Sequence, residues 1–362
     1  MGHDTDSRPD YCKMSSEPPT SSLQNIRVVG SAEACEPGSS DSYSFRNVLN
    51  AAIVAAAPEA TVNVLVFYRS VAGSTRVQFG IRQAISYIYM TSWDLLQEHE
   101  KPLVQVSVFP LKAHQTPFPW LEHPVVQREL GLKLPVQSQE TLKSQVPAIF
   151  VDDFHDQGGY GDAVLRTSAV VAAAEAAGAP VFRLGSVVTE EMRSKQDILS
   201  LNDATPTPTF DHVVMGGTFD HMHSGHRQLL TMASLVSGQA GRVVVGVTSD
   251  TILKRKKASD LIEPGSVRRE AVLSFLKAVN PQTVVEIHEI FDAGGPSIVD
   301  PLLQAIVVSS ETLRGGLWVN DKREAAGLNR LTILTVERSA AATCSSTYLR
   351  SYLAAKSSKQ SP

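Results

Sequence analysis

Short apolar runs rich in β-branched residues alternate with helical patterns along most of the chain. In the first half, an Ala-rich helical stretch begins at residue 45, and a longer apolar period near 3.6 indicates a second helix over 77–98. Apolar runs predict strands at 61–68, 103–109 and 146–151, and an Ala-rich helix is predicted over 162–177. The segment 112–143 holds several prolines and no clear period, which indicates an irregular excursion. This half is therefore expected to be an α/β domain.

The alternation is clearer in the second half. Strands are predicted at 212–215, 242–248, 283–287, 305–309 and 331–336. Helices are predicted near 226–236, 266–279, 321–327 and 346–355. This spacing implies right-handed crossovers and a mostly parallel, Rossmann-like sheet. The sequence shows no internal repeat.

Changes in composition divide the chain. Residues 1–44 are rich in Ser, Pro, Asp and Glu and are expected to be mostly disordered. An α/β domain of unknown function is expected over 45–200, and a Pro- and Thr-rich linker over 201–210. The second α/β domain should occupy 211–356, followed by a polar tail at 357–362.

Composition and charge exclude several classes of protein. The chain has 362 residues, is 43% hydrophobic and 19% charged, and carries a formal charge of −4. That charge offers no general attraction to nucleic acid or to an anionic membrane. Three scattered cysteines are too few for a disulfide framework, and no apolar run reaches the ~18 residues of a membrane span. Without an apolar leader at its start, the chain is expected to be cytoplasmic.

The sharpest chemical pattern is VVMGGTFDHMHSGH at residues 213–226, where a predicted strand meets a predicted helix. Gly216 and Gly217 let the backbone approach a ligand closely, because no Cβ intrudes. The helix that follows offers free N–H groups and a positive dipole end, which suit phosphate. His223 and His226 are three residues apart, so both imidazoles are expected to face one ligand and donate hydrogen bonds to its phosphate oxygens.

Two further segments extend this pattern. CSSTYLR at 344–350 is a Ser/Thr-rich turn that opens a helix and carries a basic residue one turn later. Alone it is also an ordinary helix cap. The run KRKK at 254–257 leaves the carboxyl end of a strand, where α/β sheets bind ligands, although most charge runs are solvated faces.

The GTFD turn followed by HxGH resembles the nucleotidylyltransferase superfamily, and 344–350 resembles its second signature. VSSETLRGGLWVNDKR at 308–323, together with VGVTSD and IEPGSVRR, resembles the phosphopantetheine adenylyltransferases of eukaryotes and archaea. The resemblance covers about residues 211–355 and rests on four separated motifs. It implies transfer of the adenylyl group of ATP to 4′-phosphopantetheine, which yields dephospho-coenzyme A and pyrophosphate. Mg²⁺ is expected to bridge the ATP phosphates rather than sit in a protein cage.

The resemblance also implies roles for individual residues. The catalytic residues would be His223, His226 and Lys256, with Lys254 and Lys256 at the substrate phosphate and Thr218 orienting it. The ATP-binding residues would be Gly216, Gly217, Thr218, His226, Arg314, Ser345, Ser346 and Thr347. Weaker candidates are Phe219, Asp250, Lys257 and Arg323. Asp220 is expected to fix the turn rather than to ligate a metal.

Alternatives remain open at this point. The chain could be another enzyme of this fold, such as a nicotinamide mononucleotide adenylyltransferase or a cytidylyltransferase, or an inactive nucleotide-binding regulator. The acidic, Gly-rich segment 151–162 is interpreted as a solvated loop. Animal relatives carry a fused C-terminal kinase, and the chain stops soon after the second domain, so that activity is expected to be absent.

Overall fold

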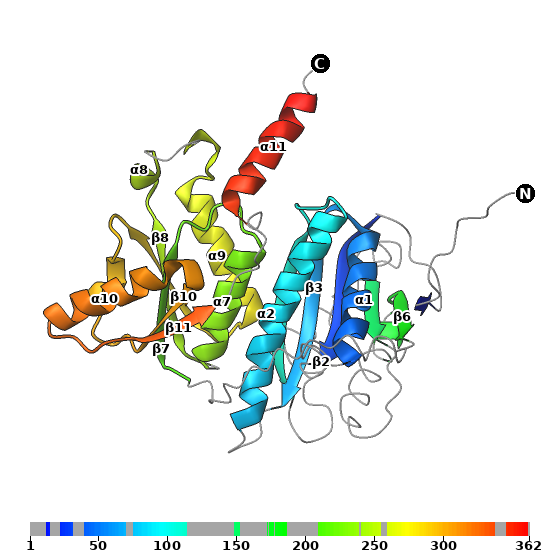
Figure 1. Ribbon diagram of the computed structural model, residues 1–362, viewed down its shortest axis with the longest axis horizontal. Coiled ribbons are helices and arrows are strands. Elements are labelled where there is room, and N and C mark those ends of the chain that lie inside the picture. Colours follow the sequence, from blue (N-terminus) through cyan, green and yellow to red (C-terminus); the bar gives the residue numbers. More distant parts are fainter. Residues whose placement is uncertain are drawn as a thin grey trace, which may run out of the picture.

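The computed structural model has two parallel α/β sheets that lie side by side, one in each half of the chain (Figure 1). The residues that it describes are 12–14, 22–31, 40–69, 75–113, 148–152, 172, 174–176, 178–186, 209–238, 240–254, 259–336 and 345–360. None of the helices in that part of the chain is long and apolar enough to cross a bilayer.

The first sheet has six strands in the order β1-β6-β5-β2-β3-β4, and all neighbours are parallel except β1 and β6. The strands are β1 (Cys12–Met14), β2 (Leu23–Ser31), β3 (Ala56–Arg69), β4 (Gln105–Ala113), β5 (Ala148–Asp152) and β6 (Val181–Ser186). The helices α1 (Ser40–Ala55) and α2 (Thr75–Glu98) belong to this half, and residues 172 and 174–176 are also helical. The predicted strands and the two helices are present, so the first half is an α/β domain.

The expectation of disorder over residues 1–44 is wrong for the part that the structure describes. Strand β2 lies inside the first sheet between β3 and β5, and Ile26, Val28 and Val29 are buried there. The apolar run IRVV is short, and the Ser- and Pro-rich segments on both sides dominate the composition around it. Most of the segments 112–143, 151–162 and 162–177, and most of the predicted linker, lie outside the described residues.

The second sheet has five strands in the order β11-β10-β7-β8-β9, all parallel. They are β7 (His212–Gly217), β8 (Arg242–Thr248), β9 (Val284–Ile290), β10 (Ala305–Ser309) and β11 (Thr332–Val336). The helices are α7 (Ser224–Val236), α8 (Asp250–Leu253), α9 (Gly265–Val279), α10 (Leu313–Ala325) and α11 (Ser346–Gln360). The short 3₁₀ turns are η3 (Ser259–Leu261), η4 (Gly295–Ile298) and η5 (Ser310–Thr312).

All five predicted strands of the second sheet are confirmed. Two boundaries were placed wrongly. Helix α10 begins at Leu313, eight residues before the predicted 321, because its two glycines at 315 and 316 hide the helical pattern. Helix α11 continues to Gln360, into the segment expected to be a polar tail.

The two sheets share one topology. Numbered in chain order from β2, the parallel strands of the first sheet run 5-4-1-2-3, with β1 added at the edge. Numbered from β7, the second sheet has the same order, 5-4-1-2-3. This is a doubly wound arrangement with its switch point between strands 1 and 4. The sequence indicated no repeat, so the likeness lies in the fold alone.

The two domains pack directly against each other. Helix α2 of the first lies beside α7 of the second (Figure 1), and one apolar core runs through both domains. That core includes Ile85 and Trp93 from α2 and Leu230 and Val236 from α7. Helix α7 is therefore enclosed by its own sheet on one side and by the first domain on the other.

Candidate active site

A cleft of about 1100 Å³ opens at the carboxyl ends of β7, β8 and β10. In a doubly wound sheet this edge, beside the switch point, is where ligands bind. Helices α7 and α11 both begin at the cleft, because Gly225 and Ser346 in their first turns line it. Two helix N-termini with free N–H groups make this wall attractive to phosphate.

The turn between β7 and α7 forms the floor of the cleft and is conformationally demanding. Phe219 and His221 both have positive φ, 54° and 45°, which side-chain-bearing residues adopt only when the surroundings hold them there. The buried Phe219 ring folds back over Gly217, where a Cβ would stand only 3.2 Å from it. A side chain at position 217 would therefore crowd the Phe219 ring, which packs against Gly217 and also lines the cleft.

His223 and His226 come together as the sequence predicted. Their rings stack with centroids 3.9 Å apart, and the Phe219 ring lies 5.4 Å from that of His226. His223 caps α7, because its Nδ1 accepts a hydrogen bond from the Gly225 N–H at 3.2 Å. A neutral imidazole that accepts at Nδ1 carries its proton on Nε2, which makes His223 a hydrogen-bond donor there.

Asp220 ties the turn to two distant segments. Its fully buried carboxylate accepts hydrogen bonds from the His221 ring at 2.8 Å, from the Glu263 N–H at 2.9 Å and from the Arg350 guanidinium. Burial favours a raised pKa for Asp220, but the bonds from His221, Glu263 and Arg350 outweigh it and hold that pKa below its usual value. The same bond to Asp220 raises the pKa of His221.

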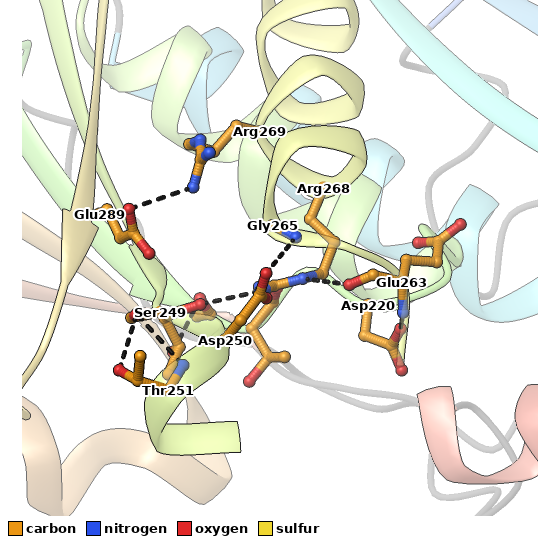
Figure 2. A network of polar contacts seen from close by, with 12 residues as sticks. Asp220, Ser249, Asp250, Thr251, Glu263, Gly265, Arg268, Arg269 and Glu289 are labelled. Atoms are coloured by element: carbon orange, nitrogen blue, oxygen red, sulfur yellow. Dashed lines mark hydrogen bonds and ion pairs between the residues drawn. The ribbon is translucent and has the colours of Figure 1, made fainter. Parts of the chain in front are cut away.

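Arg268 performs a similar task behind the cleft. Its side chain is fully buried and donates to the carbonyls of Glu263 at 2.8 Å, Thr218 at 2.7 Å and Thr248 at 3.0 Å. It also forms an ion pair with Asp250 at 2.5 Å (Figure 2). Arg268 thus holds the residues that follow β7 and β8 at a fixed separation.

The second predicted signature meets the first across the cleft. Ser345, Ser346 and Thr347 line it at the start of α11. Ser345 Oγ accepts from the Tyr348 N–H at 3.3 Å, which is a helix cap. Arg350, one turn later, also lines the cleft and reaches both Asp220 and, at 3.1 Å, Thr347 Oγ1.

The basic run at 254–257 is described only at its first residue. Lys254 ends α8 with an exposed side chain and does not line the cleft. Lys256 and Lys257 lie outside the described residues, so a lysine at the transferring phosphate stays a prediction. Asp250 joins α8 to α9 by accepting from the Gly265 N–H at 3.0 Å, a bond that, with Arg268, lowers the pKa of Asp250 (Figure 2).

Two predicted arginines differ from expectation. Arg314 was expected among the ATP-binding residues, but it lies in the first turn of α10 with an exposed side chain that does not line the cleft. The adjacent Gly315 and Gly316 do line it. Arg323 is fully buried and donates to the carbonyls of Asn329, Ser297 and Asp300 at 2.7 to 2.9 Å, so it fastens α10 to η4. Arg323 was expected to be a weaker candidate for the site, but it does not line the cleft and its contacts stabilise the fold.

Sequence reasoning missed Arg268 and Arg350 as members of the site. Both belong to segments that carried the family resemblance, IEPGSVRR and CSSTYLR, and each is the basic residue of its segment nearest a helix start. That position was the available signal. Apart from the nearby Glu263 and Thr347, their partners lie 18 to 130 residues away, so no local spacing identifies the contacts that join distant segments.

One group of metal-type ligands occurs among the described residues, Asp220, His221 and Glu263, whose ligand atoms lie within 4.8 Å of one another. Asp220 already accepts three hydrogen bonds, and Glu263 Oε2 accepts from the His221 N–H at 2.7 Å. Because Mg²⁺ prefers several free oxygen ligands, this group fits a hydrogen-bonded brace better than a magnesium site.

Comparison with known proteins agrees with this geometry. Residues 214–352 match the family model described as cytidylyltransferase-like. Over 155 residues the chain is 39% identical to the phosphopantetheine adenylyltransferase of Pyrobaculum aerophilum, which covers 42% of this chain and 97% of that protein. The enzyme of the same name from Methanopyrus kandleri is 39% identical over 36% of this chain and 82% of its own length.

The chain belongs to the phosphopantetheine adenylyltransferase family. The Pyrobaculum relative is matched over 97% of its length, and the family model covers residues 214–352, which lie in the second domain. The yeast phosphopantetheine adenylyltransferase (Saccharomyces cerevisiae) is 37% identical over 127 residues, 35% of this chain and 41% of its own length. The family likeness is therefore carried by the second domain.

Proposed function

We propose that the protein transfers the adenylyl group of ATP to 4′-phosphopantetheine, giving 3′-dephospho-coenzyme A and pyrophosphate, the penultimate step of coenzyme A synthesis. The observation that carries this proposal is the match of this chain to 97% of the length of the Pyrobaculum phosphopantetheine adenylyltransferase, together with the family match over residues 214–352. The cleft supports it, because His223, His226 and the starts of α7 and α11 converge on one phosphate-sized surface.

The reaction needs positioning more than chemistry from side chains. A phosphate oxygen of 4′-phosphopantetheine attacks the α-phosphorus of ATP, a P–O bond forms, and the bond to the β-phosphate breaks to release pyrophosphate. The attacking phosphate is already largely dianionic near neutral pH, so no general base is required. Holding both substrates in line and stabilising the charge that develops on the α-phosphate supply the rate.

The residues of the cleft divide this work. His223 carries its proton on Nε2 through the cap at Gly225, so it can donate to an oxygen of the α-phosphate as charge accumulates there. His226 lies against it and the helix N-terminus of α7 adds positive potential. Thr218 would orient the attacking phosphate, and Ser345 to Thr347 would hold the pyrophosphate end with the N-terminus of α11.

Magnesium enters this proposal as part of the substrate. The Asp220 group is committed to hydrogen bonds, as described above. We expect MgATP to bring its ion on the phosphates, where the ion neutralises charge on the departing pyrophosphate. Lys256, and with it Lys254, is assigned to the substrate phosphate because the basic run 254–257 leaves the carboxyl end of a strand.

A substrate panel tests the proposal. Pyrophosphate release by the full chain is measured with MgATP and 4′-phosphopantetheine, nicotinamide mononucleotide or glycerol phosphate, and with CTP in place of ATP. Turnover with 4′-phosphopantetheine and ATP is expected to exceed every other pair by at least about 10³-fold, because a site built for one polar substrate leaves its own groups unpaired with another. Turnover with the mononucleotide alone would overturn the proposal. ATP binding without release of pyrophosphate from any pair would instead favour a regulator.

A further inference from the structure

The outer face of α7 is held by polar side chains of the first domain. Arg227 directly follows His226 and points away from the cleft, toward strand β4. Its Nη1 donates to Ser107 Oγ at 2.7 Å and its Nη2 to Gln105 Oε1 at 2.6 Å. The guanidinium also lies 5.1 Å from the centre of the Phe275 ring, which is a cation–π contact.

One turn further along α7, a second contact crosses the interface. The Tyr89 hydroxyl of α2 lies 3.1 Å from Thr231 Oγ1, and the same hydroxyl accepts from the Val108 N–H of β4 at 3.0 Å. Both side chains are buried, Tyr89 at 1% exposure and Thr231 at 0%. Gln228 adds a bond from its Nε2 to Ser86 Oγ at 3.1 Å.

The polar contacts between α7 and the first domain depend on one docked position of α7. Within the described part of the chain, no carboxylate lies within ion-pair distance of Arg227, so its charge depends on the two neutral oxygens of β4 and the face of Phe275. A buried polar group that loses its partner costs about 1–3 kcal/mol. Any movement of α7 away from the first domain would strand several such groups at once, which makes the docked position well defined.

The docked position bears directly on the catalytic histidines. Arg227 N–H donates to the His223 carbonyl at 3.0 Å, within the first turn of α7. His223, Ser224 and Arg227 also line a second cavity of about 620 Å³, whose other walls are β4, α9 and α11. The residues anchored to β4 are thus the neighbours of the residues that face the nucleotide.

We infer that the first domain, which lacks the histidine motif, serves the reaction by fixing the start of α7, with Arg227, Ser107 and Tyr89 as positioning residues for His223 and His226. This inference rests on the proposed function, because its kinetic reading uses 4′-phosphopantetheine and MgATP. Positioning should appear in kcat rather than in KM, since a misplaced donor loses contacts that strengthen in the transition state.

The test changes Ser107 and Tyr89 of the first domain and Arg227 of α7, none of which lines the cleft at the carboxyl ends of β7, β8 and β10. Ser107→Ala and Tyr89→Phe in the full chain are each expected to lower kcat roughly 3- to 10-fold with KM for MgATP within about twofold, the effect of one hydrogen bond. Arg227→Met is expected to lower kcat roughly 10- to 100-fold, and Arg227→Lys to recover only part of it, because a lysine cannot reach both oxygens. Combining Arg227→Met with Ser107→Ala should add little to Arg227→Met alone.

Glu59→Gln is the matched control. Glu59 also joins the domains, through an exposed ion pair with Lys356 at 3.1 Å, but that pair is on α11 rather than α7. Its loss should leave kcat within about twofold of wild type. Wild-type kcat in both Ser107→Ala and Tyr89→Phe, or an equal loss in Glu59→Gln, would overturn the inference.

A readout that does not need turnover separates this inference from the proposed function. Hydrogen–deuterium exchange of the amides of residues 225–229 should rise at least about threefold in Ser107→Ala and Tyr89→Phe, and should not rise in Glu59→Gln. Unchanged exchange in the first two variants would also overturn the inference. Faster exchange in the two variants, together with a wild type that does not turn over 4′-phosphopantetheine, would support the positioning role and refute the proposed function.

Discussion

The two domains of this chain have the same order of parallel strands, but they differ in the residues that connect the first strand of that order to the next helix. In the second, six residues between β7 and α7 carry His221 and His223, and α7 supplies His226. In the first, the residues between β2 and Phe45 in α1 read AEACEPGSSDSYS and include no histidine. The doubly wound sheet is common to both, so the fold alone does not select the chemistry. The turn and the helix start at the switch point do.

The domains also differ in how their first helix is used. The main contacts of helix α1 are with elements of its own domain, whereas α7 is shared between both domains. Strand β4 is the edge strand of the first sheet, and helix α7 of the second domain packs against it. A helix held on two sides can keep its histidines within the narrow tolerance that the proposed transfer reaction requires.

Making the second domain resemble the first should have the largest effect. In the proposed reaction His226 acts on the phosphate charge that develops in the cleft, so kcat of His226→Ala with MgATP and 4′-phosphopantetheine is expected to fall about 10²- to 10³-fold. The control is His99→Gln in the first domain, where the ring bonds Asn50 Oδ1 at 2.7 Å. That control should retain wild-type kcat, and a His226→Ala enzyme of normal rate would refute the assigned role.

The second largest effect is expected at Asp220, whose carboxylate joins the turn to Arg350. Asp220→Asn keeps the shape of the side chain but removes the charge that faces Arg350, and it leaves one buried bond mismatched. We expect kcat to fall about 10-fold and the free energy of unfolding to drop by about 1–3 kcal/mol. Glu270→Gln, an exposed change on α9, should alter neither. Urea unfolding and steady-state rates check both values, and a stable, fully active Asp220→Asn protein would contradict the brace.

Nucleotide binding should affect amide exchange in the second domain and not in the first, which can be measured on the wild-type protein. At about ten times its Kd, MgATP is expected to slow amide exchange about tenfold at residues 216–226 and 345–350, where the ligand closes the cleft. The amides of β2 and α1 should keep their exchange rates, because the first switch point has no histidine turn to hold phosphate. Equal protection in both sheets would mean that the first domain binds nucleotide as well.

The smallest expected effect concerns pH. The bond to Asp220 raises the pKa of His221, so the charged pair stabilises the folded chain fully below the unfolded pKa of about 6.5. That contribution is lost as pH rises through the raised folded pKa. The free energy of unfolding of His221→Gln should therefore be lower than that of wild type by less than about 1 kcal/mol at low pH. The difference should be smaller still at pH values above the raised pKa of His221. Unfolding free energies from about pH 5.5 to about pH 9 would check this, and a gap that widened with pH would contradict it.

The strands of the second domain could be predicted from the sequence because each is a compact apolar run between turn residues, as VVMGG and RVVVGVT are. Strand β2 could not, since its apolar core is as short as a chance cluster and its flanks are polar. Pattern reasoning finds an element from its own residues. It does not find one whose identity depends on the neighbours β3 and β5.

The candidate site follows the same division. His223 and His226 share one short motif, so their meeting could be foreseen from spacing alone. The bonds of Arg268 to Thr218 and of Arg350 to Asp220 join residues 50 and 130 positions apart, which only the folded sheet brings together. Arg323 shows the opposite error, because a charged helix segment gives no sign that one of its arginines is buried.

The bond between Arg350 and Asp220 also imposes an order on how the protein matures. The ribosome makes the turn at 218–223 long before it makes α11, and domains fold as their sequences emerge. Until α11 emerges, the buried Asp220 carboxylate has no guanidinium to face it. The cleft is thus completed only after α11 has been synthesised, more than about 120 residues after the turn, and a nascent chain that ends before α11 lacks the guanidinium that faces Asp220.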